Sequence, residues 1–318
     1  MELVILSGKG GTGKTSLVGS LAVLAENKVM VDADVDAADL HLLLNAQENE
    51  PQAFATSSRA EIMTARCSGC GICRDLCRFD AIKTEPDYTA PGGQRFFVVP
   101  YSCEGCGVCT HFCPEDAIAF ERVESGRWFV SDTEYGTLVH ARLGIAEGNS
   151  GKLVSLLREK AREIAEKENR EAIIIDGPPG IGCPVIASLT GADFALLVTE
   201  PSKSAFHDLD RLLELIAHFK IPAGLCINKY DINPALSRRM ETYAAEKNVP
   251  VLARIPFDPS VTKAQVAGKP LVAFCDNESA QEIRSLWEKL REHLKTLKKT
   301  PKTIKTIDIL ANKPNLRE

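Results

Sequence analysis

The chain has 318 residues, of which 44% are hydrophobic and 25% charged, and this ordinary globular composition excludes disordered and fibrous proteins. A formal net charge of −5 gives no electrostatic reason to expect nucleic acid, and without an apolar run of about eighteen residues we expect no membrane partner. No export signal precedes the first predicted strand, so the eleven cysteines are expected to stay reduced in the cytoplasm and to serve a purpose other than disulfides.

The first predicted elements are a strand, a glycine-rich loop and a helix. The apolar run Leu3 to Leu6 predicts the strand, and the Ala- and Leu-rich pattern from Lys14 to Ala25 predicts the helix. A second buried strand, Val29 to Val31, ends in the acidic segment Asp32 to Asp36. Because ligands of open α/β sheets bind at the carboxyl ends of the strands, the loop and the acidic segment are candidates for one site.

The glycine-rich loop, Gly8 to Thr15, matches the phosphate-loop pattern G-x-x-x-x-G-K-T and has the strand and helix that this pattern requires on either side. Its backbone N–H groups are expected to surround phosphate oxygens, aided by the dipole of the following helix. Lys14 is expected to neutralise the β- and γ-phosphates, and Thr15 to bind Mg²⁺. The predicted nucleotide-binding residues of this segment are Gly8, Gly10, Gly11, Thr12, Gly13, Lys14, Thr15 and Ser16.

The α/β pattern stops near Pro51 and resumes near Ser150, and eight of the eleven cysteines lie in between. The segment Cys67 to Cys77 recurs 36 residues later as Cys103 to Cys113, with the same C-x₂-C-x₂-C-x₃-C spacing. This internal repeat predicts an inserted α+β ferredoxin-like domain. The predicted domains are a P-loop ATPase domain in two parts (1–55 and 126–295), the inserted domain (56–125) and a basic C-terminal tail (296–318).

The cysteine spacing is that of bacterial ferredoxins with two [4Fe–4S] clusters, in which the fourth cysteine of each run binds the other cluster. Zinc is the competing metal, but zinc sites use separated C-x₂-C pairs, which two interleaved ligand sets fit poorly. Pro114 follows the second run as expected, whereas Arg78 replaces proline after the first. The predicted ligand sets are Cys67, Cys70, Cys73 and Cys113 for one cluster, and Cys103, Cys106, Cys109 and Cys77 for the other.

The second half of the chain returns to alternating helices and strands. Leu153 to Lys167 is predicted as an amphipathic helix, and Ala172 to Ile175 as a buried strand that ends at Asp176. Asp176 is expected to hold Mg²⁺ through a water molecule, as the second acidic element of phosphate-loop enzymes does. The predicted fold class is α/β, with a mostly parallel P-loop NTPase sheet and helices on both faces. Further predicted strands are Phe194 to Val198, Gly224 to Ile227 and Val249 to Ala253.

Three ordered motifs give the chain a resemblance to a known family. Lys9 to Thr15, Asp32 to Asp34 and Asp176 to Gly180 together resemble the MinD/Mrp family of dimeric ATPases, which includes the nitrogenase iron protein. The resemblance implies that Lys9 reaches across a nucleotide-sandwich homodimer to the partner's phosphates, so that hydrolysis requires dimerisation. It also implies that Asp34 orients the attacking water and that Asp32 sits near the metal. The catalytic residues expected on this basis are Lys9, Lys14, Asp34 and Asp176.

The identity of the base is ambiguous in the sequence. Asn228 to Asp231 fits N-K-x-D, which reads guanine in GTPases, but relatives in the resembled family carry a similar Asn-Lys pair and use ATP, with the Asn contacting the base. ATP is therefore preferred over GTP. Pro256 lies in a loop that this family packs against the base, although an ordinary strand-ending turn fits the same residues.

Three isolated cysteines and the last helix bear on the function. Cys183 follows Asp176 at an offset where the nitrogenase iron protein holds a bridging cluster, but a packed thiol is favoured because the second bridging cysteine has no counterpart. Mrp-type carriers place a C-x₂-C pair late in the chain, which Cys226 and Cys275 do not form. The apolar stripe from Ile283 to Leu297 is expected to pack on the sheet rather than to bind a membrane as in MinD.

The leading hypothesis is that ATP-driven dimer rearrangement gates electron transfer through two clusters to a redox or iron–sulfur partner protein. The insertion lies in the sequence between the acidic segment and Asp176. The cysteines are therefore joined at both ends to elements that are expected to sense the γ-phosphate. One alternative is an ATP-dependent iron–sulfur cluster scaffold or carrier. The other is a MinD-like positioning ATPase with structural or sensory clusters.

Overall fold

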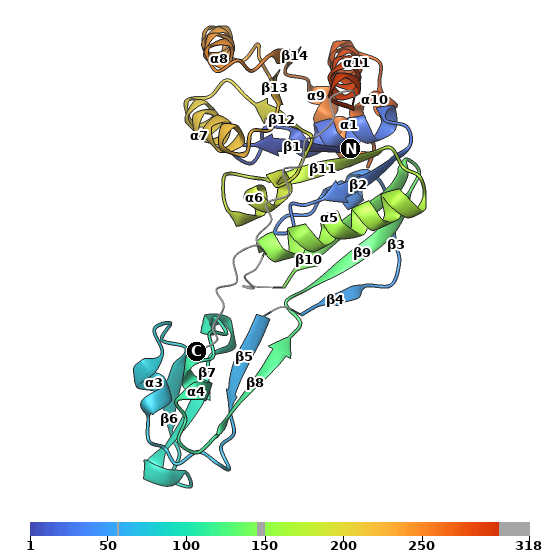
Figure 1. Cartoon of the computed structure of the whole chain (residues 1–318). Coiled ribbons are helices and arrows are strands. Elements are labelled where there is room, and N and C mark those ends of the chain that lie inside the picture. The colour runs from blue at the N-terminus through green and yellow to red at the C-terminus, as the bar shows by residue number, and fades with distance from the viewer. Residues whose placement is uncertain (56, 145–149, 299–318) are drawn as a thin grey trace, which may run out of the picture.

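The computed structural model of the chain describes residues 1–55, 57–144 and 150–298. Its main body is a ten-stranded sheet with helices on both faces, and a separate lobe extends from one side of this body (Figure 1). The predicted α/β fold with a mostly parallel sheet is confirmed. No helix in the described ranges is long and apolar enough to cross a membrane.

The parallel strands run in the order β14-β13-β12-β1-β11-β2-β10. Every strand predicted from an apolar run is present, and β14 begins two residues later than predicted. The phosphate loop and the ends of β2, β11 and β13 meet at one edge, because the carboxyl ends of parallel strands share one side of a sheet. The bounds are Glu2–Ser7 (β1), Lys28–Asp32 (β2), Gly136–Leu143 (β10), Ala172–Pro179 (β11), Phe194–Thr199 (β12), Ala223–Asn228 (β13) and Val251–Ile255 (β14).

Two layers of helices bury alternate side chains of the central strand β1. Val4 and Leu6 pack with one layer, and Leu3 and Ile5 with the other, as the two-residue period of a strand requires. The first layer consists of α5 (Ser150–Lys167), α6 (Cys183–Leu189), α7 (Lys203–Phe219) and α8 (Pro234–Glu246). The second consists of α1 (Lys14–Leu24), α2 (Leu40–Leu43), α9 (Pro259–Val266), α10 (Leu271–Phe274) and α11 (Glu278–Lys298).

Helix α11 buries the C-terminal apolar stripe against the main body. Ile283, Leu286, Leu290 and Leu294 belong to the core that α11 shares with α1 and β14. These side chains are therefore not available as a membrane-binding surface, and the expectation that the stripe packs on the sheet is confirmed for them. The side chain of Leu297 and the basic tail beyond residue 298 lie outside the described residues.

The lobe is built from the two cysteine repeats. β5 (Ser57–Ile62) pairs antiparallel with β8 (Ile118–Val123), and β6 (Ile82–Pro86) with β7 (Gln94–Val98). The ring of Phe96 lies beside Gly71 and the ring of Phe120 beside Gly107, so the two repeats are packed alike. The short helices of the lobe are α3 (Ile72–Leu76), α4 (Val108–His111) and two 3₁₀ turns at Pro91–Gly93 and Pro100–Ser102.

A β-hairpin that was not predicted joins the lobe to the sheet. β9 (Gly126–Thr133) pairs antiparallel with β10, and the short strands β3 (Gln47–Glu48) and β4 (Gln52–Phe54) pair with β9. The main sheet thus resumes at Gly126, although the alternating helices and strands of the sequence resume only near Ser150. Buried polar residues, Ser131 in β9 and His140 in β10, interrupt the apolar positions of the hairpin, so the sequence shows only short apolar runs there.

Candidate functional site

The phosphate loop connects β1 to α1 and packs tightly against two other segments. Gly13 has φ 87°, in the left-handed region, and a Cβ atom there would lie 2.4 Å from Asn228 Nδ2. A Cβ atom at Gly8 would lie 2.4 Å from Asp208 Cβ. Both positions therefore require glycine. Because the first N–H groups of a helix have no partner within it, the start of α1 is suited to bind an anion.

A buried ion pair lies under the loop. Lys14 Nζ is 2.5 Å from Asp176 Oδ1, and the two side chains are 6% and 1% exposed. Burial alone would lower the pKa of Lys14, but the charge and hydrogen bond of Asp176 outweigh burial and raise that pKa. Within the described residues, Asp176 Oδ2 and Thr12 Oγ1 are buried without a hydrogen-bond partner. Such orphaned polar atoms are costly unless a ligand or water satisfies them.

The acidic segment after β2 lies beside this pair. Asp32 accepts hydrogen bonds from the backbone N–H groups of Asp34 (3.1 Å) and Leu40 (3.0 Å). Burial, followed by the charge of Asp176, raises the pKa of Asp32 well above its usual range. Burial also raises the pKa of Asp34, to about 6. Removing these carboxylates from water thus makes both of them more basic.

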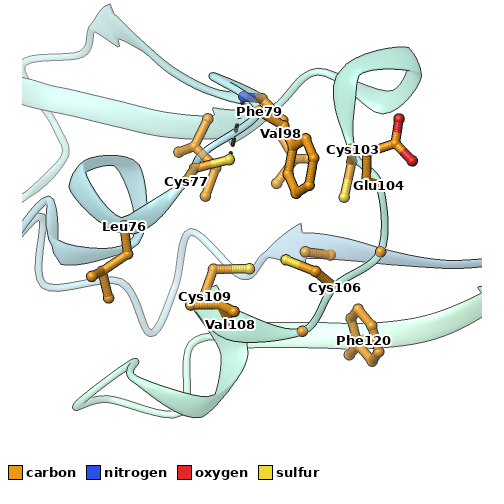
Figure 2. A pocket seen from close by; sticks show the side chains of 15 residues that line it. Leu76, Cys77, Phe79, Val98, Cys103, Glu104, Cys106, Val108, Cys109 and Phe120 are labelled. Carbon is orange, nitrogen blue, oxygen red and sulfur yellow. Dashed lines mark hydrogen bonds between the residues drawn. The ribbon is translucent and has the colours of Figure 1, made fainter.

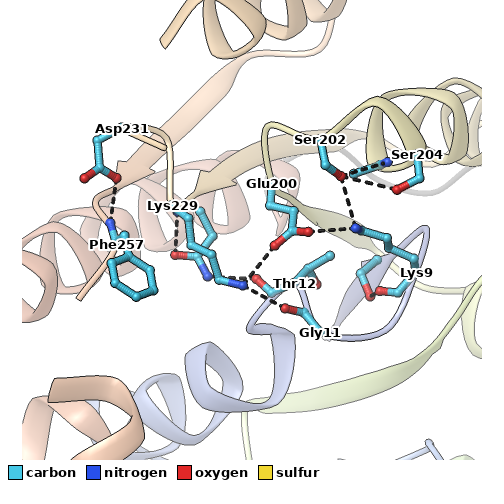
Figure 3. Close-up of polar contacts among 12 residues, drawn as sticks. Lys9, Gly11, Thr12, Glu200, Ser202, Ser204, Lys229, Asp231 and Phe257 are labelled. Atoms are coloured by element: carbon cyan, nitrogen blue, oxygen red, sulfur yellow. Dashed lines mark hydrogen bonds and ion pairs between the residues drawn. The ribbon is translucent and has the colours of Figure 1, made fainter. Parts of the chain in front are cut away.

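A cleft of about 700 Å³ opens above these residues, which is a volume typical of small-ligand sites. Asn228 Nδ2 donates to Thr12 O at 2.7 Å, so the end of β13 is fixed to the phosphate loop. Asp231 accepts a hydrogen bond of 2.7 Å from Phe257 N, and does not line the cleft (Figure 3). The lining includes Gly10, Gly11, Thr12, Gly13, Lys14, Thr15, Ser16, Asp34, Asp36, Asn228, Lys229, Pro256, Phe257 and Gln265.

Lys9 does not line this cleft. Its ammonium group forms an ion pair with Glu200 (2.7 Å) and donates to Ser202 Oγ (3.0 Å) (Figure 3). Lys229 also pairs with Glu200, at 2.9 Å. Burial works against the charge of Glu200, but its hydrogen bonds to the two lysines prevail and lower its pKa. Lys9 is thus folded back onto its own chain.

The eight repeated cysteines line two separate pockets in the lobe. Each pocket gathers three thiols from one repeat and one from the other. One is lined by Cys103, Cys106, Cys109 and Cys77 (Figure 2), and the other by Cys67, Cys70, Cys73 and Cys113. Two backbone groups already donate to sulfur, Ala81 N to Cys77 Sγ at 3.4 Å and Ala117 N to Cys113 Sγ at 3.3 Å.

The loops that carry these thiols lie close to neighbouring backbone. Gly69 has φ 75°, and a Cβ atom there would be 2.4 Å from Pro91 O. At Gly105, with φ 62°, it would be 2.1 Å from Ser58 O. Burial raises the pKa of the Cys73 thiol to about 11 and also raises that of Cys109. These thiols thus resist ionising unless a cationic group is present.

No disulfide joins any of the eleven cysteines. Among the described residues, no group of three or more His, Cys, Asp and Glu side chains is arranged to hold a metal ion as it stands. The packed thiol favoured for Cys183 is not observed, because Cys183 is exposed at the start of α6. Cys226 is buried in β13, and Cys275 follows α10. These three cysteines lie on separate elements.

Backbone hydrogen bonds connect the acidic segment to the stem of the lobe, by which we mean Glu124 and Ser125 between β8 and β9. Leu143 N donates to Val35 O at 3.2 Å, and Val35 lies between Asp34 and Asp36. The next residue, Gly144, donates to Ser125 O at 2.8 Å. Ser125 lies between β8 of the lobe and β9 of the sheet, so the nucleotide cleft and the lobe share one short backbone connection.

Several residues of the site were not predicted. Glu200 and Gln265 are among them, and Gln265 Nε2 donates to Ser16 Oγ at 2.8 Å. The only sequence signal for Glu200 is its place at the end of a predicted strand, at the edge where ligands bind. Lys9, Gly8 and Asp176 were predicted as site residues, and the structure places them beside the cleft rather than in its lining.

The fold and the site together define a P-loop nucleotide-binding protein, because a phosphate loop lies between β1 and α1, with Asp32 at the end of β2 and Asp176 paired with it in β11. The profile of the CobQ/CobB/MinD/ParA nucleotide binding domain matches residues 3–271, so the chain belongs to this family.

The chain is also similar to individual proteins, by sequence in two cases and by fold in a third. An uncharacterized protein of Methanocaldococcus jannaschii is 35% identical over 92% of this chain and 98% of that protein. An iron-sulfur cluster carrier protein of Pyrococcus horikoshii is 27% identical over 40% of this chain and 47% of its own length. The solved septum site-determining protein MinD of Pyrococcus horikoshii, complexed with Mg-ADP, has a TM-score of 0.56 at 18% identity and covers 93% of this chain and 98% of MinD. This last likeness shows a shared fold.

Proposed function

We propose that the chain is a MinD/ParA-like ATPase in which ATP binding, hydrolysis and dimer rearrangement control electron transfer through two [4Fe–4S] clusters held by the lobe. The observation that carries the proposal is that two consecutive residues bond to both sides: Leu143 N donates to Val35 O in the acidic segment, and Gly144 N donates to Ser125 O in the stem of the lobe. A nucleotide that moves Asp34 must also move Val35, and with it the strands that support the cysteines.

The charges of the cleft support a Mg-nucleotide. A bound phosphate would give Lys14 a second anionic partner, and the free Asp176 Oδ2 would accept from a water on Mg²⁺ held by Thr15. Mg²⁺ would neutralise charge on the phosphates. Asp34, with its pKa raised to about 6, would orient the water that attacks the γ-phosphate.

ATP is proposed as the nucleotide in preference to GTP. A guanine-reading aspartate must reach the base, whereas one carboxylate oxygen of Asp231 holds Phe257 N and the residue does not line the cleft. Competition between ATP and GTP for a fluorescent ATP analogue tests this assignment. Equal competition by both nucleotides would contradict it.

The two cysteine pockets suit four-iron clusters better than zinc. Zn–S bonds of about 2.3 Å place the sulfurs of a tetrahedral site about 3.8 Å apart, and no described group of side chains is arranged to hold a metal ion. A larger cluster needs thiols spread around a pocket, with backbone N–H groups beside the sulfurs, as Ala81 and Ala117 provide. When bound, such clusters carry single electrons from a reduced redox protein to an oxidised acceptor.

A resident redox role is favoured over a carrier role by the way the thiols are shared. Each pocket draws its fourth thiol from the other repeat, so release of a cluster would have to break its bonds to both repeats. The second candidate is an ATP-dependent cluster carrier, which is favoured by the relative of that name in Pyrococcus horikoshii. The missing late C-x₂-C pair counts against it.

The deciding experiment is a redox titration of anaerobically purified protein, followed by EPR, without nucleotide and with Mg-ATP or Mg-ADP. Electron-transfer coupling predicts cluster potentials that shift with Mg-ATP, and an ATPase rate that depends on cluster oxidation state. Lys14→Ala is the matched control, with clusters bound but no nucleotide response. If neither quantity changes, the coupling is refuted. ATP-dependent transfer of iron to an apo-ferredoxin would instead establish the carrier.

A further inference from the structure

Glu200, directly after β12, holds two lysines of the nucleotide site at once. Its Oε1 atom lies 2.7 Å from Lys9 Nζ, and its Oε2 atom lies 2.9 Å from Lys229 Nζ (Figure 3). The Glu200 side chain is 18% exposed and the lysines are 28% and 27% exposed, so solvent screens these ion pairs only in part. The three residues form what we call the Glu200 clamp.

Within the clamp, the two lysines are held differently. Lys229 has a further anchor, because its ammonium group donates to Gly11 O at 3.0 Å. Lys9 donates instead to Ser202 Oγ, and Ser202 caps the amino end of α7 by accepting from Ala205 N at 3.3 Å. The amino end of a helix carries partial positive charge and disfavours a cation. Glu200 is therefore the group that makes this position favourable for Lys9.

We propose that Glu200 is a positioning residue that keeps Lys9 folded back on its own subunit and releases it only when two nucleotide-loaded subunits meet. This inference rests on the proposed ATP-dependent dimer and on the role that the family resemblance implies for Lys9, contact with the phosphates of a partner subunit. The competitor for Lys9 is the partner's triphosphate, which carries more negative charge than a single carboxylate. The clamp thus makes dimer formation depend on ATP in the partner and suppresses dimers of empty subunits.

The sign and size of the effect follow from symmetry. A two-fold dimer must open two clamps, so the contribution of one ion pair counts twice. Partly exposed ion pairs contribute modestly, and removing both clamps should tighten the ATP-bound dimer about tenfold. Glu200→Gln keeps the size of the side chain and removes its charge, so it isolates the electrostatic effect.

The test measures the monomer–dimer dissociation constant of the anaerobically purified full chain by sedimentation, with Mg²⁺ and a non-hydrolysable ATP analogue. Glu200→Gln is expected to dimerise at about tenfold lower concentration than the wild type. Glu241→Gln, which removes the same charge from a surface ion pair with Arg254, should leave the constant unchanged. If Gln at this position prevents folding, Glu200→Asp replaces it, because the shorter side chain cannot reach both lysines.

A second measurement tests whether Glu200 holds Lys9 in the absence of a dimer. The labelling rate of Lys9 by a small amine-reactive reagent, followed by mass spectrometry of the nucleotide-free protein, should rise several-fold in Glu200→Gln. Unchanged labelling, or a dimer no tighter than the wild type, overturns the clamp. By contrast, a wild type that never dimerises with the ATP analogue, or a Lys9→Ala variant that hydrolyses ATP normally, overturns the proposed function instead.

Discussion

His41 on α2 and His140 on β10 stack face to face, with ring centroids 5.2 Å apart and an interplanar angle of 5°. His140 stacks in turn on Phe129 of β9, at 5.0 Å. Arg142 contacts His41 Nε2 at 3.0 Å and lies over the ring of Phe129. The rings therefore connect the helix behind the acidic segment with the hairpin that leads to the cysteine lobe, in parallel with the backbone bonds of Leu143 and Gly144.

His41→Ala should weaken communication between the two sites while both remain able to bind. His41 lines neither the nucleotide cleft nor a cysteine pocket, so iron content and ATP affinity should match the wild type. The shift of cluster potential on adding Mg-ATP should become smaller, because the stacked contact between α2 and the hairpin is lost while the backbone hydrogen bonds of Leu143 and Gly144 remain. Redox titration with and without nucleotide measures this, and His218→Ala, an exposed histidine, is the control. If the shift of cluster potential in His41→Ala were as large as in the wild type, the stacked rings would contribute to packing but not to coupling between the two sites.

His140 predicts a pH dependence of stability. Burial, with the nearby His41 and Arg142, lowers its pKa to about 3, whereas in the unfolded chain it is about 6.5. Below pH 6.5 the unfolded chain gains a proton that the folded chain excludes, so this contribution to stability is lost as the pH falls. The loss from pH 7 to pH 5 is about 2 kcal/mol.

The variant that isolates this contribution is His140→Phe, which keeps a ring between His41 and Phe129 but cannot titrate. Urea unfolding at pH 7 and pH 5 should show a smaller acid-induced loss than in the wild type, by about 2 kcal/mol. All other titrating groups are common to both proteins and cancel in the comparison. Identical losses would mean that His140 is protonated in the folded chain at pH 5.

Removing Lys14 should destabilise the nucleotide-free protein, because Asp176 is then buried without its counter-charge. The free energy of unfolding of Lys14→Ala at pH 7 should fall by about 3 kcal/mol. Lys229→Ala, which removes a partly exposed lysine, should lose about 1 kcal/mol or less. Urea unfolding measures both. If both variants lost the same free energy of unfolding, the buried ion pair between Lys14 and Asp176 would contribute no more to stability than the partly exposed pair of Lys229.

Asp34→Asn should separate ATP binding from hydrolysis. An amide cannot accept the proton of the attacking water, so the turnover number should fall by about 100-fold or more. Binding of Mg-ATP should persist, because a negative charge facing the phosphates has been removed. Asp36→Asn is the matched control, since Asp36 lies in the same segment and also lines the cleft. If Asp36→Asn were the inactive variant, the role assigned to Asp34 would belong to Asp36.

The parts of this structure that can be predicted are those set by residues close together in the sequence. The phosphate loop, the apolar strands and the cysteine repeats are contiguous patterns, and the expected elements appear at or near their predicted positions. The β9–β10 hairpin escaped prediction because His140 and Ser131 are buried in it as a hydrogen-bonded pair at 2.9 Å. Polar residues that satisfy each other inside a sheet look like loop residues in the sequence.

The orientation of Lys9 shows the same limit at the candidate site. The family resemblance implies a lysine that reaches outward, but the position of the Lys9 ammonium group depends on Glu200, which lies far along the chain. Likewise, His41, Phe129 and His140 come from three different elements and meet only in the folded sheet. Contacts of this kind leave no spacing pattern, so only the three-dimensional structure reveals them.

The pairing of cysteines can be tested by choosing which two thiols to remove together. If each cluster takes three ligands from one repeat and the fourth from the other, Cys67 and Cys113 serve the same cluster, whereas Cys67 and Cys77 serve different ones. The double variant Cys67→Ser/Cys113→Ser should then keep about four iron atoms per chain, and Cys67→Ser/Cys77→Ser should lose both clusters. Cys275→Ser should keep about eight iron atoms, the content of two intact clusters. Iron and sulfide analysis after anaerobic reconstitution measures all three, and the reverse order of the two double variants would mean that each repeat binds its own cluster.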